Sequence, residues 1–135
     1  LHYYLCCVIT TIDSVVDPKV ILEAQSVSES IYVDPKIEDY VLNLISATRE
    51  PRESGLDELE NIIDFGASPR ATINLIKAAK ARAFTEKRGY VTPEDIRFIG
   101  KDVLRHRIIL TYEAEAEEMS SDDVIDRLFE SIEVP

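Results

Sequence analysis

The sequence has few of the residues that metal sites and disulfide scaffolds use. It contains no tryptophan, one methionine, two histidines and two cysteines. Cys6 and Cys7 are neighbours, and a disulfide between neighbours would need a strained ring outside normal disulfide geometry. Two adjacent thiols with His2 and a distant His106 also lack the paired ligand spacing of structural zinc sites. We therefore expect no metal site and a reducing, cytoplasmic location.

The motifs of self-contained catalysis are also missing. The one Gly-Lys pair, Gly100-Lys101, is followed by Asp102, and Asp95 stands where the first glycine of a phosphate-binding loop would be. The sequence has no His-Glu-x-x-His zinc motif and no Gly-x-Ser-x-Gly nucleophile motif. We therefore expect no enzymatic activity from this chain alone.

The first residues are apolar but too few to cross a membrane. Residues 1–12 carry no Asp, Glu, Lys or Arg, whereas a membrane span needs about 20 apolar residues. They lack the basic start of a signal peptide, and the chain has no initiator methionine. We interpret residues 1–16 as an apolar N-terminal segment, either the remnant of a preceding core or a product of where a longer protein was cut.

Charge is distributed in three blocks, although the whole chain has a net charge of −11. Residues 1–65 sum to −9, residues 66–107 to +6 and residues 108–135 to −8. A chain of 135 residues, 45% of them hydrophobic, is long enough for one domain with its own core. The cationic block either is neutralised by the acidic arms or faces an anionic ligand.

Helices are expected where a capping residue precedes proline, because proline suits the first helical turn. The pattern predicts helices over residues 18–28, 35–49 and 69–87, and a fourth from residue 93 that is broken at Gly100. Ser120 and Asp123 cap a last helix. Apolar residues at helical spacing mark the inward positions, which are Ile21, Ala24, Val27, Ile37, Tyr40, Val41, Leu44, Ile45, Thr48, Leu75, Ile76, Ala79, Ala83, Val124, Ile125, Leu128, Phe129 and Ile132.

The predicted fold is mainly α, a small helical bundle. Only residues 1–12 and 107–112 are rich enough in strand formers to indicate minor strands. The polar stretch of residues 50–65 reads as a long connection, either an acidic surface excursion or a functional loop.

The most informative motif is Gly66-Ala67-Ser68-Pro69-Arg70. Gly66 permits backbone angles closed to other residues, Ser68 can cap the helix, and Pro69 suits its first position. Arg70 then lies on the first helical turn, where the helix dipole disfavours a cation. Either a phosphate, which helix N-termini and arginine both bind, or an acidic side chain from another segment would compensate.

Five ordered blocks resemble the helical lid of the MoxR family of AAA+ ATPases. They are Ala47-Thr48-Arg49, Gly66 to Ala71, Lys77 to Ala83, Gly89 to Ile96 and Val103 to Ile108. The resemblance covers residues 17–135 and implies an AAA+ lid domain that closes over ATP held by a missing α/β core. In the intact parent, an expected ATP hydrolase that uses ATP and Mg, it implies that closure couples hydrolysis to chaperone-like remodelling or maturation of client proteins.

The resemblance also implies site residues and partners. It makes Arg70 the sensor 2 arginine, which reaches the γ-phosphate of nucleotide in the same subunit, and assigns ATP contacts to Gly66, Ala67, Ser68, Pro69 and Arg70. We expect no tight nucleotide binding to this chain alone. The implied partners are the chain's own α/β core, neighbouring subunits of a ring and a von Willebrand A domain protein, with no nucleic acid and no membrane span.

Two other classes of function stay open on the sequence. The basic block and the helix-turn-helix around Thr92-Pro93 resemble a histone-like nucleic-acid-binding module, although no aromatic platform accompanies the charge. A plain protein-interaction domain, with the basic strip facing an acidic partner, is the other alternative.

Overall fold

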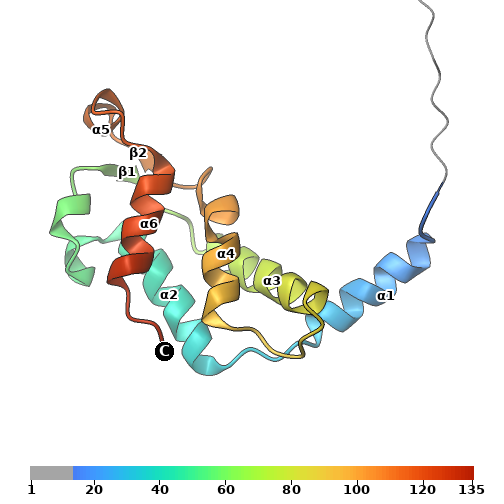
Figure 1. Ribbon diagram of the computed structural model, residues 1–135. Coiled ribbons are helices and arrows are strands. Elements are labelled where there is room, and N and C mark those ends of the chain that lie inside the picture. The colour runs from blue at the N-terminus through green and yellow to red at the C-terminus, as the bar shows by residue number, and fades with distance from the viewer. Residues whose placement is uncertain (1–13) are drawn as a thin grey trace, which may run out of the picture.

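The computed structural model describes residues 14–135, so the strand expected in residues 1–12 lies outside the described residues. The prediction of a mainly α fold is confirmed (Figure 1). The helices of the described residues are α1 (Pro18–Glu29), α2 (Pro35–Arg49), α3 (Arg70–Thr85), α4 (Pro93–Leu104), α5 (Tyr112–Ala116) and α6 (Ser121–Ser131), with short 3-10 helices at Arg52–Ser54 and Asp57–Leu59.

Helices α2, α3, α4 and α6 pack around one apolar core. Each contributes a stripe at helical spacing, because residues three and four apart share a face. The stripes predicted for α2, α3 and α6 are confirmed, with Ile76 and Ile132 only partly buried at their edges. The buried members are Ile37, Tyr40, Val41, Leu44, Ile45, Thr48, Leu75, Ala79, Ala83, Val124, Ile125, Leu128 and Phe129.

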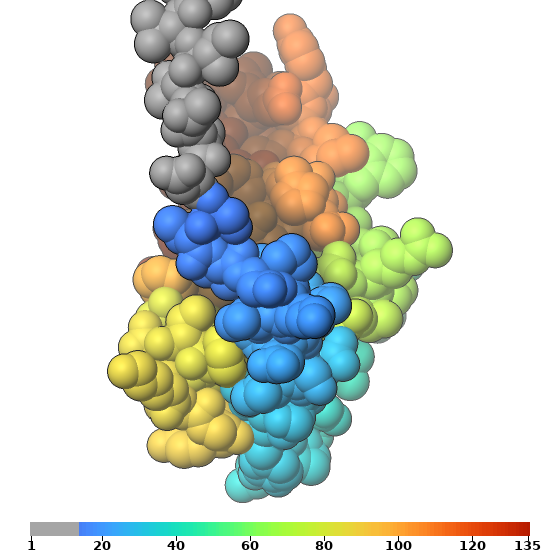
Figure 2. All heavy atoms as spheres, turned by 90° about the vertical axis from the view of Figure 1, so that its right-hand side faces the viewer, coloured from blue at the N-terminus to red at the C-terminus, as the bar shows by residue number. Residues whose placement is uncertain are grey.

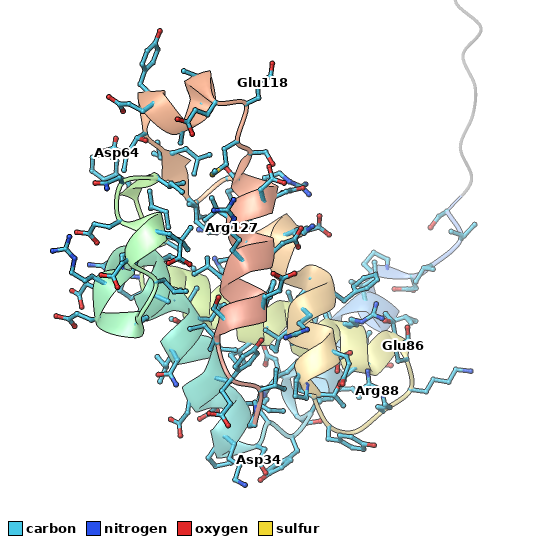
Figure 3. All side chains as sticks on the ribbon, turned by 60° about the vertical axis from the view of Figure 1, so that its left-hand side comes forward. Asp34, Asp64, Glu86, Arg88, Glu118 and Arg127 are labelled. Atoms are coloured by element: carbon cyan, nitrogen blue, oxygen red, sulfur yellow. The ribbon has the colours of Figure 1, made fainter. Side chains whose placement is uncertain are left out.

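Local capping fixes where several helices begin. The Asp34 carboxylate, at the start of α2 in Figure 3, accepts the Lys36 N–H at 2.9 Å. The predicted cap of α6 is also confirmed, since the Asp123 carboxylate accepts the Ser120 N–H at 2.9 Å and the Ser120 hydroxyl accepts the Asp123 N–H at 3.3 Å. These caps satisfy amides that have no partner within the helix.

Helix α1 differs from its prediction. None of its residues is buried, and the expected inward residues Ile21 and Val27 are 52% and 53% exposed. The reason is position: α1 lies at one end of the molecule, where α3 is its main neighbour among the helices of the bundle (Figure 1). Lys80 of α3 donates to the Glu29 carbonyl at 2.8 Å and holds the C-terminal end of α1.

Helix α4 is continuous, so the break expected at Gly100 is wrong. A Cβ at Gly100 would lie 2.2 Å from the Phe129 ring of α6. Glycine is needed here for the close approach of two helices, and the packing it allows offsets its low helix propensity.

The connection between α2 and α3 is more ordered than the expected surface excursion. Leu56 and Leu59 anchor it in the core. It ends in strand β1 (Ile63–Phe65), which pairs antiparallel with β2 (Ile109–Leu110) inside the expected strand region. Ile63 lies opposite Leu110 and Phe65 opposite Ile109. The sheet therefore places the start of α3 beside the end of α2.

Candidate functional site

The turn from Gly66 to Arg70 joins β1 to α3 and lies against the last turn of α2. Gly66 does not use the left-handed backbone angles that its prediction invoked; among the described glycines only Gly55 does. Gly66 is needed for space instead. A Cβ there would lie 2.1 Å from the Thr48 carbonyl oxygen and 2.8 Å from Arg49 Cα. Any side chain would push the turn off α2.

Thr48 holds the turn through its hydroxyl. The side chain is fully buried, and its Oγ1 donates to the Ile45 carbonyl at 2.6 Å while accepting the Ala67 N–H at 3.0 Å. The Thr48 hydroxyl and the Ala67 N–H both lie in the core, where an amide without an acceptor would be costly. The hydroxyl thus fixes the turn to α2.

Ser68 does not act as the predicted side-chain cap. Its side chain is exposed, and the capping position of α3 is Pro69, with φ −55° and ψ −22°. Because Pro69 is already helical, the backbone closes the first turn: the Ser68 carbonyl accepts the Ala71 N–H at 2.8 Å and the Pro69 carbonyl accepts the Thr72 N–H at 3.2 Å. The prediction that Pro69 is the first helical residue is therefore wrong by one position, because Pro69 is the capping residue and α3 begins at Arg70.

Arg70 is exposed at the first residue of α3. No Asp or Glu within residues 14–135 lies at ion-pair distance from it. The alternative in which an acidic side chain compensates Arg70 therefore finds no support in the described part of the chain. The cation follows a turn that is anchored through the buried Ala67, and its own side chain is exposed.

Other cations of the basic block are paired. Lys101 contacts Asp126 at 2.7 Å, and Arg105 binds both carboxylate oxygens of Asp122 at 2.6 and 2.9 Å. These contacts join α4 to the acidic C-terminal arm. Four of the ten cations of the block thus make ion pairs within residues 14–135, namely Arg82, Arg88, Lys101 and Arg105, and these are less available to a nucleic-acid backbone.

The corner between α3 and α4 holds an ionic cluster that the sequence did not reveal. Asp95, 1% exposed, accepts two hydrogen bonds from Arg88, at 2.6 and 2.9 Å, and one from the Thr92 N–H at 2.9 Å. Arg82 Nε lies 3.3 Å from Asp95, and its guanidinium stacks 3.4 Å from the Phe98 ring centroid. Figure 3 shows Arg88 beside this corner.

The ion pairs also set the pKa of Asp95. Burial raises the pKa, but the hydrogen bonds from Arg88 and Thr92 favour the charged form and lower it overall. The charged carboxylate therefore fixes the angle between α3 and α4, and with it the direction of the helix that carries Arg70. Thr48, Arg82 and Asp95 are positioning residues that sequence reasoning missed, although a threonine on the apolar stripe of α2 was a visible signal for one of them.

Two other features bear on function: side chains grouped to hold a metal ion, and a helix that could cross a membrane. Residues 14–135 contain no group of three His, Cys, Asp or Glu side chains placed to hold a metal ion. No helix of that range is both long and apolar enough to cross a membrane.

Comparison with known proteins gives consistent matches. The family described as AAA lid domain matches residues 58–128. Chaperone MoxR1 of Mycobacterium tuberculosis is 38% identical over 115 residues, covering 85% of this chain and 30% of that protein. Protein MoxR of Methylorubrum extorquens is 33% identical over 118 residues, covering 83% and 34%.

A solved structure shares the fold. The crystal structure, described as a "putative ATPase" from Cytophaga hutchinsonii, aligns with a TM-score of 0.84 and 41% identity, covering 87% of this chain and 36% of that one. The chain therefore spans about a third of the length of the relatives that it matches.

Proposed function

This chain belongs to the AAA lid domain family, as the lid of a MoxR-type AAA+ ATPase, and from that premise we propose that Arg70 contacts the terminal phosphate of ATP held by a nucleotide-binding core. Gly66, Ala67, Ser68 and Pro69 form the turn that presents it. Residues 17–135, from the cap of α1 onward, act as the lid.

The observation that carries the proposal is an unpaired arginine on a rigid turn. The helix dipole disfavours a cation at this place by about 0.3–1 kcal/mol, yet no carboxylate of residues 14–135 compensates it. A charge-assisted hydrogen bond to phosphate contributes about 1.5–3 kcal/mol. The exposed guanidinium at a helix start thus fits an anionic group.

The contact gives the lid a different affinity for the ATP and ADP states. When bound with Mg, ATP supplies the terminal phosphoryl group. Arg70 gains its hydrogen bond while that phosphate is present and loses it once the phosphate has left. A ligand can shift a conformational equilibrium only by such a difference in affinity, and a difference of about 1.4 kcal/mol changes the ratio of closed to open lids tenfold.

The remaining expectations concern the whole protein. In our proposal the parent is an ATP hydrolase that forms a ring, and closure of the lid drives chaperone-like remodelling or maturation of a client. A von Willebrand A domain partner stays a prediction of the MoxR resemblance, and a cytoplasmic location stays a prediction from the two adjacent cysteines. The names of two relatives, Chaperone MoxR1 and Protein MoxR, support the proposal of a chaperone-like role.

The test is turnover in the full-length ATPase that carries this chain. We expect Arg70→Ala to lower ATP turnover about tenfold or more, while Arg70→Lys, which keeps the charge but not the planar fork of donors, retains part of the activity. Arg127→Ala is the matched control, because Arg127 is another exposed arginine, on α6 (Figure 3), without an ion pair within residues 14–135. Equal turnover in Arg70→Ala and Arg127→Ala would contradict the proposal.

A further inference from the structure

Helix α1 exposes more aliphatic surface than a helix of its length can carry alone. Six of the fifteen large hydrophobic residues that are exposed within residues 14–135 lie between residues 15 and 27. The helix has 12 residues and no buried one. Isolated helices of this length are marginal in water, and a concentrated exposed apolar surface marks an interaction site.

Two of the exposed aliphatic residues of α1 share a face with a half-buried alanine. Val20, Ala24 and Val27 fall at i, i+4 and i+7 and share one face, which we call the α1 stripe. Val20 and Val27 are each 53% exposed, and Ala24 is half-buried at the edge that meets α3. Leu22, 64% exposed, lies on another face of the helix.

A hollow lies directly beside the stripe. It has a volume of about 600 Å³ and is lined by Val27, Ile31 and Phe84 together with the connection from Lys87 to Gly89. In Figure 2, α1 stands as a ridge over the adjoining part of α3. A ridge of small aliphatic side chains next to a hollow can receive the side chains of a packed helix or sheet.

We propose that the nucleotide-binding core packs on the α1 stripe. This proposal rests on the proposed function, because it takes the core as its partner. The matched relatives are about three times as long as the part this chain covers, so the whole protein has ample surface to bury the stripe. A second copy of the chain is a poorer occupant, since each copy carries a net charge of −11 and the two repel.

The α1 contact and the phosphate contact are separate. Helix α1 meets α3 near Lys77, Lys80 and Ala81, whereas Arg70 opens that helix. Lys77 and Ala81 follow Arg70 by seven and eleven positions, which is about 10 to 16 Å along a helix. An apolar contact at α1 needs no phosphate. We therefore expect the contact at α1 to be independent of nucleotide, whereas the contact at Arg70 changes between ATP and ADP.

Hydrogen exchange of the α1 amides tests this inference. In the full-length ATPase without nucleotide, we expect these amides to exchange about tenfold or more slowly than in the 135-residue chain, a factor that corresponds to about 1.4 kcal/mol. Val27→Asp should remove the extra protection. Leu22→Asp, which adds the same charge at a comparably exposed position of the same helix, should leave it.

Two results would overturn the inference. Equal exchange of α1 in the full-length protein and in the 135-residue chain would mean that the core does not cover the stripe. Protection in the 135-residue chain that rises with its concentration would make a second copy the occupant. The proposed function fails separately: protected α1 amides together with unchanged turnover in Arg70→Ala would support the docking of the core and contradict the phosphate contact.

Discussion

The two ends of α3 use arginine in opposite ways. At its C-terminal end, Arg82 and Arg88 converge on the buried Asp95. At its N-terminal end, Arg70 faces solvent, and no carboxylate of the described residues lies at ion-pair distance from it. The chain has 26 acidic residues, so acidic partners are not scarce. The contrast separates cations that stabilise the fold from a cation that is available to a ligand.

What the two ends share is rigidity. Asp95 fixes the angle between α3 and α4, and Thr48 with Gly66 fixes the turn that precedes Arg70. For the phosphate contact that we propose for Arg70, a turn whose backbone is already held in place lowers the ordering cost of binding. Substitutions at these supports should therefore lower the free energy of unfolding. A substitution of Arg70 itself should not.

Asp95→Ala should have the largest effect on stability. The substitution leaves two arginines without their buried carboxylate, and breaking a buried ion pair from one side costs about 3–5 kcal/mol of unfolding free energy. Chemical denaturation measures this loss. Asp126→Ala is the control, because the Asp126–Lys101 pair is exposed and should contribute little. A similar, small change in both variants would remove the distinction between the two kinds of ion pair.

Gly66→Ala should have the second-largest effect on stability, because overpacking should lower the free energy of unfolding by about 1–3 kcal/mol. The added methyl would meet the Thr48 carbonyl, which is backbone and cannot swing away. Gly89→Ala is the matched control, since nothing lies within 4 Å of a Cβ there. Thermal melting of the two variants compares them directly. If they melt at the same temperature, the close approach of the turn to α2 is wrong.

Thr48→Val should cost about 1–3 kcal/mol, because it replaces the hydroxyl by a methyl of similar size and leaves the buried Ala67 N–H without an acceptor. Thr48→Ser keeps the hydroxyl and should restore most of the slow exchange of the Ala67 amide, which hydrogen-exchange NMR can follow. Slow exchange of that amide in Thr48→Val would show that another group holds the turn.

A smaller effect should appear on acidification. The folded-state pKa of Asp95 is lowered, so its contribution is present above the unfolded pKa, near 4, and is lost as the pH falls through the folded pKa. The difference in unfolding free energy between the wild-type chain and Asp95→Asn should therefore shrink below about pH 4. Denaturation curves from pH 6 to pH 2 measure it, and a constant difference would contradict the charged state assigned to Asp95.

The elements that the sequence predicted correctly are local ones. The α2 stripe and the Ser120–Asp123 cap depend on residues within a few positions of each other, so their spacing carries the information. The exposure of α1 was missed because burial depends on what packs against a helix. Strand β1, three residues long, is too short to show an alternating pattern.

The candidate site divides in the same way. Proline at the start of α3 and the position of Arg70 followed from local residue types. The reason for Gly66, the role of the Ser68 carbonyl and the hydrogen bond from Ala67 to Thr48 did not, because each depends on α2 lying against the turn. Sequence reasoning found the exposed arginine at the start of α3 and missed the residues that hold its turn against α2.

The central claim is that Arg70 discriminates between nucleotides that carry a terminal phosphate and those that do not. The most direct measurement is the affinity of the full-length protein for a non-hydrolysable ATP analogue and for ADP, with and without Arg70→Ala. Our account predicts that the variant binds the analogue about tenfold or more weakly and ADP with unchanged affinity. Equal losses for both nucleotides, or no loss for either, would contradict it.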